Sequence, residues 1–317
     1  MSKPCENKCQ EQFKTMIGGQ ALIEGIMMRG PEKTAIVVRA PEGIVEKVEP
    51  NQKKERPKWY KWPLIRGVVN FGASMTDGVK ALLYSADFFP EEEAESQSKF
   101  DKWLEKHIPV EKLEKIIVPL GAVLGVLFSI GMFILLPAVI MELLSGLIKP
   151  YFVRNIIEGV LRIGIFVLYL MLVSRMKEMR RVFSYHGAEH KTIRCYEAKL
   201  PLTVENVRGM TRFHPRCGTS FIFVVLIISI LLFTVVRVTN PFLRVLCKLA
   251  LLPVLVSIAY EINRFVGRHD NAFTRFMTKP GLWFQNFTTQ EPDDSMIEVG
   301  IRSLELVLPE QEGSDQW

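Results

Sequence analysis

Two long runs without any charged residue dominate the hydrophobic pattern of the chain. The first extends from Ile116 to Met141 and continues, past Glu142, to Ile148. It is longer than the about 20 residues that an α-helix needs to cross the hydrocarbon core of a bilayer. The second run, Thr219 to Val236, is close to that length. Both runs predict transmembrane helices.

Two further apolar segments contain charged residues and predict weaker spans. Ile156 to Val173 is interrupted by Glu158 and Arg162, which lie four residues apart and can pair on one face of a helix. Pro241 to Tyr260 carries two basic residues in its first half. We therefore predict a mainly α-helical, polytopic membrane protein with about four transmembrane helices.

The segments outside these spans predict a few smaller elements. Runs rich in β-branched residues at Thr34–Arg39 and Ile44–Val48 flank a turn that contains proline and glycine, and they predict a β-hairpin. Leu64–Ala86 is moderately apolar and predicts an interfacial helix. In Met296–Leu308 the apolar residues repeat at helical spacing, which predicts an amphipathic helix packed on the rest of the molecule, with Asp293 near its start as a capping residue.

These patterns divide the chain into four regions. Residues 1–90 are predicted to form a cytoplasmic region with a glycine-punctuated stretch at Ile17–Pro31, the hairpin and the interfacial helix. Residues 91–115 are acidic at their start and predict a solvated linker. The membrane domain covers residues 116–260 and includes a cytoplasmic loop at 174–218. Residues 261–317 form a cytoplasmic tail.

Charge sets the orientation of the predicted spans. With 48% hydrophobic and 23% charged residues, composition alone does not separate this chain from a large soluble protein. The loop at 174–218, however, is dense in lysine and arginine, and such loops stay on the cytoplasmic side. Four spans then place both termini in the cytoplasm. No signal peptide is expected, and the five scattered cysteines fit a reducing compartment better than a disulfide framework.

The same loop contains candidate metal ligands. The sequence His-Gly-Ala-Glu-His begins at His186, and on a helix His186 and His190 share a face and can bind one ion. The order His-x-x-Glu-His is the inverzincin pattern, in which the carboxylate activates a metal-bound water, so Glu189 is the candidate general base. His214 and Cys217 complete a tetrahedral set of four donors. Mixed His and Cys donors favour zinc.

Three interpretations of this cluster stay open. The first is a zinc-dependent hydrolase, conceivably a protease, in which either His214 or Cys217 leaves a coordination position for water. The second is a non-catalytic protein-biogenesis or assembly factor, in which four bound donors only stabilise the structure. In the third, the histidines pair with nearby carboxylates and bind no metal. A transporter is disfavoured because no span carries a series of buried acidic residues.

The basic loop also suggests partners beyond the lipid bilayer. Its lysines and arginines suit anionic lipid, the ribosome or a membrane protein with an acidic surface. A nucleotide is a poor candidate, because the glycine-punctuated stretch Ile17–Pro31 lacks the Gly-Lys-Ser/Thr ending of a phosphate loop. We interpret its glycines as turn residues and sites of close packing.

Several longer motifs resemble one known family. They are Gly18-Gly19-Gln20-Ala21 with Glu24-Gly25, the stretch from Tyr185 to Lys191, Thr203 to Val207, His214 with Arg216-Cys217-Gly218, and Thr288-Thr289 with Glu291-Pro292. With these motifs the sequence resembles the YqhQ-like bacterial membrane proteins, which are described as predicted metal-dependent enzymes. The resemblance implies a multi-span protein of the bacterial cytoplasmic membrane with a metal centre, and it specifies no substrate.

Overall fold

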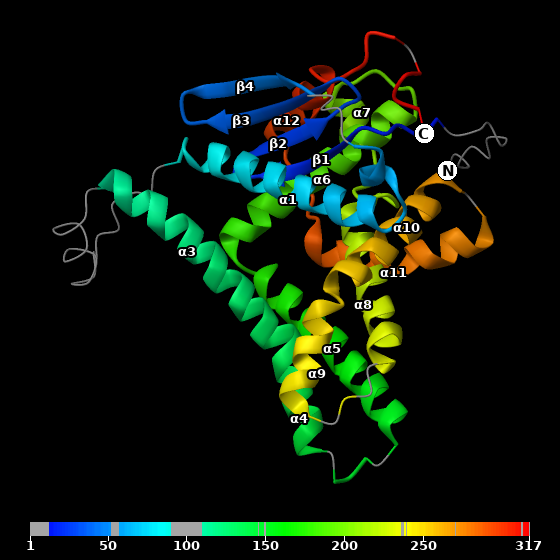
Figure 1. Cartoon of the computed structure of the whole chain (residues 1–317). Helices are drawn as coiled ribbons and strands as arrows, with labels where there is room; N and C mark the ends of the chain where they lie inside the picture. Colours follow the sequence, from blue (N-terminus) through cyan, green and yellow to red (C-terminus); the bar gives the residue numbers. More distant parts are fainter. Residues whose placement is uncertain are drawn as a thin grey trace. The chain divides into compact units, whose positions relative to one another are not determined.

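The fold was analysed in a computed structural model, which describes residues 13–51, 57–89, 110–144, 146–148, 150–235, 238, 240–269, 271–311 and 313–316. The described part is mainly helical and contains a small antiparallel sheet (Figure 1). Cys5, Cys9 and the acidic run at the start of the predicted linker lie outside the described residues. The chain forms two compact units. The first unit combines Met1–Phe89, Leu170–Val225 and Val256–Trp317, and the second combines Pro90–Tyr169 and Leu226–Leu255.

The sheet of the first unit is an antiparallel meander. Its strands are β1 (Gly18–Leu22), β2 (Gly25–Arg29), β3 (Lys33–Ala40) and β4 (Gly43–Pro50), paired in that order. The hairpin of β3 and β4 confirms the prediction, with Lys33 opposite Pro50 and Ala40 opposite Gly43. Strands β1 and β2 were not predicted, because their glycine, glutamine and methionine residues have little intrinsic preference for strands.

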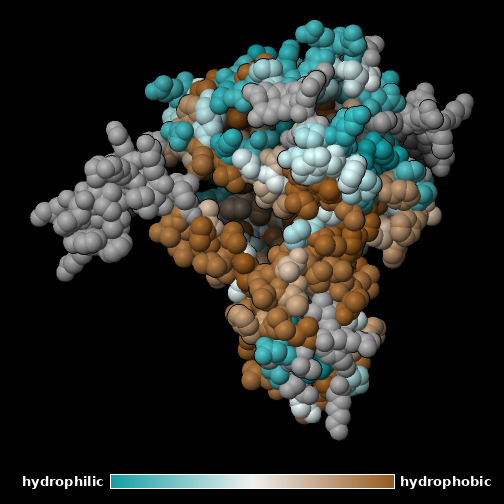
Figure 2. Space-filling model, viewed as in Figure 1, coloured by the Kyte–Doolittle hydropathy of each residue, from teal (hydrophilic) through white to brown (hydrophobic). Residues whose placement is uncertain are grey.

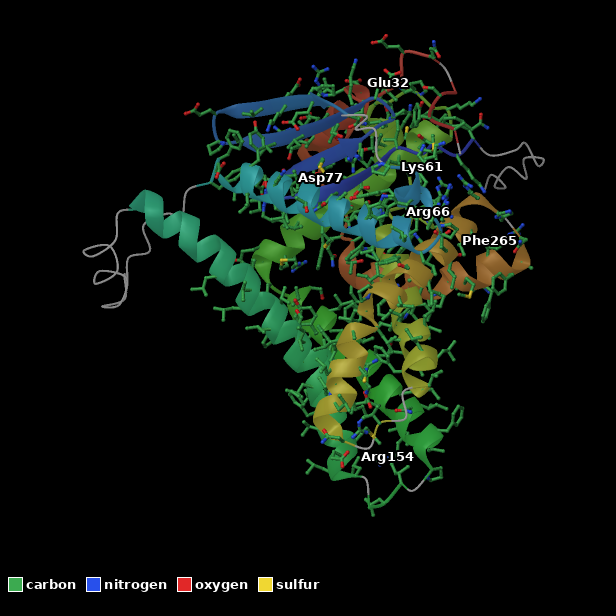
Figure 3. The ribbon with its side chains drawn as sticks, in the orientation of Figure 1. Glu32, Lys61, Arg66, Asp77, Arg154 and Phe265 are labelled. Atoms are coloured by element: carbon green, nitrogen blue, oxygen red, sulfur yellow. The ribbon has the colours of Figure 1, made fainter. Side chains whose placement is uncertain are left out.

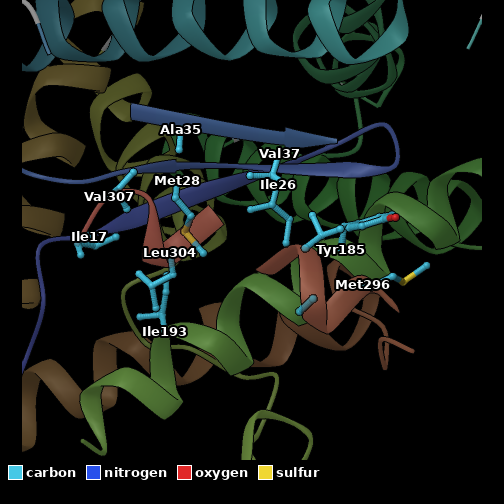
Figure 4. Close-up of a cluster of buried hydrophobic side chains, with 12 residues drawn as sticks. Ile17, Ile26, Met28, Ala35, Val37, Tyr185, Ile193, Met296, Leu304 and Val307 are labelled. Carbon is cyan, nitrogen blue, oxygen red and sulfur yellow. The ribbon is translucent and has the colours of Figure 1, made fainter. Parts of the chain in front are cut away.

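Two helices pack with this sheet and form the core of the first unit. They are α6 (Lys177–Glu197) and α12 (Asp294–Glu305), which contact each other. Helix α6 also contacts β1 and β2, and α12 contacts β2 and β3. Side chains from the two helices, β2 and β3, among them Ile26, Val37, Tyr185, Ile193 and Leu304, form one buried hydrophobic cluster (Figure 4). The predicted amphipathic helix near the C-terminus is thus confirmed.

Side-chain caps fix two helix starts in the first unit. Asp293 accepts a hydrogen bond from the backbone N–H of Met296, as predicted for the start of α12. Thr203 caps the short helix α7 (Val204–Arg208) in the same way, with the N–H of Asn206 as donor. Each cap satisfies a backbone amide that has no partner inside the helix.

The first unit also contains three further helices and most of α10 (Leu252–Arg268). The three helices are η1 (Lys58–Lys61), α1 (Ile65–Ala86) and α11 (Ala272–Thr288). Helix α1 lies within the segment predicted as an interfacial helix and leaves Val68, Met75 and Val79 exposed. It pairs with α10 through a hydrogen bond from the Asn70 amide to the Tyr260 hydroxyl, at 2.9 Å.

Apolar helices form the second unit. They are α3 (Val110–Ile130), the π-helical turn η2 (Gly131–Leu135), α4 (Leu136–Leu143), most of α5 (Tyr151–Val173), the second half of α8 (Gly218–Thr234) and α9 (Pro241–Ala250). Figure 2 shows hydrophobic side chains over most of the visible face of these helices, whereas hydrophilic side chains gather over the sheet of the first unit. Exposed apolar helices of this kind are typical of a bilayer environment.

Among the described residues, two helical stretches are long and apolar enough to cross a membrane. One is Leu120–Leu143, formed by α3, η2 and α4, and the other is Phe152–Val173 of α5. Helices α9 and α10 are bent by 41° at their junction and would count as a third span if they act as one. The uncharged segment predicted as a strong span forms only a shorter apolar helix, Phe221–Thr234, so two or three spans meet the length criterion rather than four.

A buried charge cluster explains how α5 forms one long apolar helix although it contains charged residues. Glu158 and Arg162 pair at 3.0 Å, and Lys248 of α9 also donates to Glu158. Arg162 further donates to the backbone oxygen of Phe133 in the π-helical turn (2.8 Å) and to Ser229 (3.1 Å). A π-helical turn leaves carbonyl groups without their normal helical donors, and the guanidinium group satisfies one of them.

Candidate metal centre

Helix α6 presents the His-x-x-Glu-His motif in the interior of the first unit. Tyr185, Ala188 and Ile193 pack in the hydrophobic cluster and fix the rotation of the helix about its axis. With this rotation Glu189 is only 5% exposed and His190 only 1%. The segment Thr288–Pro292 crosses α6 at Gly187, where a β-carbon would lie 2.0 Å from the backbone oxygen of Gln290. Glycine is therefore required at this position for the crossing.

Backbone carbonyl groups orient both histidines of the motif. His186 Nδ1 lies 2.8 Å from the oxygen of Thr288, and His190 Nδ1 lies 2.6 Å from the oxygen of Arg212. A carbonyl oxygen only accepts, so each Nδ1 carries the hydrogen and donates it. The lone pair of each neutral ring is then on Nε2. Such hydrogen bonds commonly fix the tautomer and orientation of metal-binding histidines.

Cys217 is the third donor of the group. It directly precedes α8, and its sulfur accepts hydrogen bonds from the backbone N–H and the hydroxyl of Thr219, both at 3.5 Å. His186 Nε2 lies 3.2 Å from Cys217 Sγ. The start of a helix favours the thiolate form of a cysteine, which is the form that binds metals.

His186, His190 and Cys217 lie close enough together that they could hold a metal ion. One donor atom each of His186, His190 and Cys217 lies within 4.8 Å of the other two. Donors around a tetrahedral zinc ion lie about 3.3–3.7 Å apart, as follows from Zn–N distances of about 2.0–2.1 Å and Zn–S distances of about 2.3 Å. His190 Nε2 is fully buried and has no hydrogen-bond partner among the described residues. A buried imidazole nitrogen without a partner is costly, and a bound cation would remove that cost.

Glu189 lies beside this group but is not part of it. Its Oε1 accepts a hydrogen bond of 2.9 Å from the backbone N–H of Gly19 in β1, while its Oε2 is buried and has no partner in the described part of the chain. A β-carbon at position 19 would lie 3.0 Å from the Glu189 carboxyl carbon and 2.7 Å from the backbone oxygen of Met27. The Gly18-Gly19 motif therefore allows β1 to approach the carboxylate closely.

His214 belongs to a neighbouring ion-pair network. Its ring lies 5.5 Å from that of His190, but its Nε2 lies 3.5 Å from Glu197, which also binds Arg216. Gln285 is fully buried and exchanges two hydrogen bonds of 2.8 Å with the backbone of His214. Of the four predicted ligands, three thus form the compact group and His214 faces Glu197.

Electrostatics inside the site favour an ionised sulfur. Burial raises the pKa of the Cys217 thiol, but the adjacent imidazoles of His190 and His186 outweigh this effect and hold the pKa well below its ordinary range. Burial would lower the pKa of His186, yet the nearby Cys217 and Glu189 raise it to about 9. Burial lowers the pKa of His214 to about 4, against the opposing effect of Glu197. Burial also raises the pKa of Glu189, although the histidines oppose this shift.

Several residues that support the site could not be found from the sequence. The carbonyl groups of Thr288 and Arg212 orient the histidines, and Lys191, next to His190, is buried and pairs with Glu291. Thr288, Lys191 and Glu291 lie in stretches quoted for the family resemblance, whereas Arg212 does not. Thr288 and Arg212 act through backbone atoms, which the residue type does not reveal.

Sequence comparison assigns the chain to a family whose function is not known. The chain belongs to the family described as "Protein of unknown function (DUF1385)", whose model matches residues 62–310. It is similar to "Uncharacterized protein YqhQ" of Bacillus subtilis (strain 168), with 32% identity over 308 residues and 94% of each chain covered. The resemblance to the YqhQ-like proteins is thereby confirmed. No solved structure matches the chain.

Proposed function

We propose that this protein is a zinc-dependent hydrolase of the bacterial cytoplasmic membrane. The observation that carries the proposal is the group of His186, His190 and Cys217, in which each histidine donates from Nδ1 to a carbonyl oxygen and keeps Nε2 for the ion. Two imidazoles and one thiolate suit zinc better than magnesium or calcium, which prefer oxygen ligands. Three protein ligands are the usual number in catalytic zinc sites.

Glu189 takes the role of general base in this proposal. A zinc ion held by the three donors would lower the pKa of a water molecule and polarise a substrate carbonyl or phosphoryl group. The Glu189 oxygen that has no partner is the proton acceptor, and the Gly19 amide holds the other oxygen in place. Its burial in the same interior strengthens its interactions with charged groups.

The position of His214 favours the catalytic interpretation over the structural one. A structural zinc site has four protein ligands and no open position. His214 would have to leave Glu197 to become the fourth ligand. The non-catalytic assembly factor therefore requires a rearrangement that the hydrolase does not.

The topology is part of the same proposal. Segments from both ends and the middle of the chain form the first unit, in which α12 contacts β2, β3 and α6. This packing supports a first unit that lies on one side of the membrane, with an even number of crossings between Val225 and Val256. We assign α8 and the bent pair α9–α10 as the third and fourth spans. The lysines and arginines of the loop at 174–218 support a cytoplasmic location for the first unit and for both termini.

Metal content is the first test. In detergent-purified protein, elemental mass spectrometry should find about one zinc per chain in the wild type and in Glu189→Gln. The double variant His186→Ala/His190→Ala should lose it. A wild type without stoichiometric metal would refute the zinc site and favour a non-catalytic factor, whose basic face binds anionic lipid, the ribosome or an acidic partner.

A second measurement separates catalysis from structural support. Glu189→Gln should keep zinc and thermal stability but fail to restore the phenotype of a deletion strain, whereas Glu205→Gln, a matched change of an exposed carboxylate on α7, should restore it. If Glu189→Gln restores the phenotype fully, the hydrolase proposal is wrong and the site is structural.

A further inference from the structure

A cavity of about 400 Å³ lies in the first unit, beside the turn that carries Cys217. Four arginines line it, namely Arg66 of α1, Arg216 of the turn, and Arg264 and Arg268 of α10. Figure 3 labels Arg66 near the start of α1. No aspartate or glutamate is among the described lining residues. A concave site with several converging cations is a suitable place for an anion.

Ion pairs neutralise only half of these charges. Arg66 binds Glu261 with two hydrogen bonds, one of them 2.6 Å long, and Arg216 binds Glu197. Arg264 and Arg268 form no ion pair with any described residue. They lie four residues apart on one face of α10, where like charges repel each other. The dipole of α10 favours Arg268 in the last turn, but it does not explain why cations from three separate elements converge on one cavity.

We propose that this cavity binds a phosphate group, carried by a lipid or by a soluble compound. Guanidinium groups form two parallel hydrogen bonds with phosphate oxygens, and the two arginines that form no ion pair with a described residue can supply four donors in this way. Tyr260, Asn70 and Asn263 add polar side chains to the wall. Met16 and Val266 add apolar surface, so the ligand has an organic part next to its charge.

The cavity adjoins the metal centre through one turn of the chain. Pro215 and Arg216 line the cavity, while Cys217, the next residue, is a donor of the three-residue group. Arg216 Nη2 also lies 3.5 Å from His214 Nε2. A phosphate-bearing molecule held by Arg264 and Arg268 therefore lies beside the centre. Its role as a substrate rests on the proposed hydrolase, whereas its binding does not.

Calorimetric titration with pyrophosphate tests the site in detergent-purified full-length protein at low salt. The wild type should bind one pyrophosphate per chain, and Arg264→Gln/Arg268→Gln should bind it at least ten-fold more weakly, because two charged donor groups are lost. Lys80→Gln/Lys279→Gln is the matched control. It removes two exposed positive charges outside the cavity, from α1 and α11, and should bind like the wild type.

A second titration identifies the source of the phosphate. Short-chain phosphatidylglycerol is compared with short-chain phosphatidylcholine, which carries no net charge. Saturable binding of phosphatidylglycerol alone, weakened in the arginine variant, indicates a lipid headgroup, while tight pyrophosphate binding indicates a soluble ligand. If neither probe binds saturably, or if the arginine variant binds as well as the lysine control, the proposal is wrong. Zinc content, measured on the same samples, tests the metal centre separately.

Discussion

At the scale of single residues, the crossing at Gly187 holds the site together. The segment Thr288–Pro292 supplies the carbonyl that orients His186, and Gln290 in the same segment donates to the oxygen of Phe183 at 2.8 Å. Alanine at 187 would raise helix propensity by about 1 kcal/mol. Its β-carbon, however, would clash with the Gln290 oxygen, and overpacking of this kind typically costs about 1–3 kcal/mol.

We therefore expect Gly187→Ala to lower both the Tm in detergent and the zinc content, since α6 must move away from the Thr288 carbonyl. Gly72→Ala in α1 is the matched control, because a β-carbon there meets no atom within 4 Å. Its Tm should stay equal or rise. A Gly187→Ala protein with wild-type Tm and zinc content would show that the crossing is not needed.

The predictability of the site also differs from residue to residue. Helical spacing alone predicted that His186 and His190 share a face, and the structure confirms it, with the ring centroids 4.4 Å apart. Whether His214 joins the two histidines or turns to Glu197 depends on where the turn at 214–217 lies against α6. Tertiary contacts such as the buried Gln285 fix this position, and no local pattern encodes them.

At the scale of elements, α5 and α9 are joined by charges rather than by apolar contacts alone. Glu158 is 3% exposed and pairs with both Arg162 and Lys248, which is 1% exposed. Removing one partner of a buried ion pair costs about 3–5 kcal/mol, because a buried charge is left unpaired. Glu158→Gln leaves two such cations, and we expect a large fall in the Tm, measured by tryptophan fluorescence in detergent.

Lys248→Met is the informative comparison for this prediction. It removes one of the two cations and leaves Glu158 paired with Arg162, so the remaining pair is neutral. The Tm of this variant should therefore fall less than the Tm of Glu158→Gln. Equal losses in the two variants would mean that charge balance does not hold α5 and α9 together. The sequence predicted the pair of Glu158 and Arg162, because the two residues lie four positions apart on one helix. It could not predict that Lys248 joins them, because this contact depends on how α9 packs against α5.

At the scale of the whole molecule, the contacts of the first unit restrict the number of membrane crossings. A single span between Val225 and Val256 would separate α12 from the sheet, and it would also separate Glu261 from Arg66. By length and hydropathy alone, two or three of the described helices are able to cross a membrane. With the first unit on one side of the membrane, as proposed, two or four spans are possible, and we expect the short apolar helix α8 and the bent pair to cross together or not at all.

Cysteine labelling in intact cells with a membrane-impermeant maleimide tests this parity. Leu147→Cys, in the turn after α4, is 82% exposed and should react from outside, and Phe242→Cys at the start of α9 should react as well if four spans are present. Lys199→Cys should react only after the cells are opened, and the parent protein controls for its native cysteines. If only Leu147→Cys reacts, α8 and α9–α10 form a re-entrant pair. A reaction of Glu310→Cys in intact cells would contradict the one-sided first unit, because Glu310 pairs with Lys33 of β3.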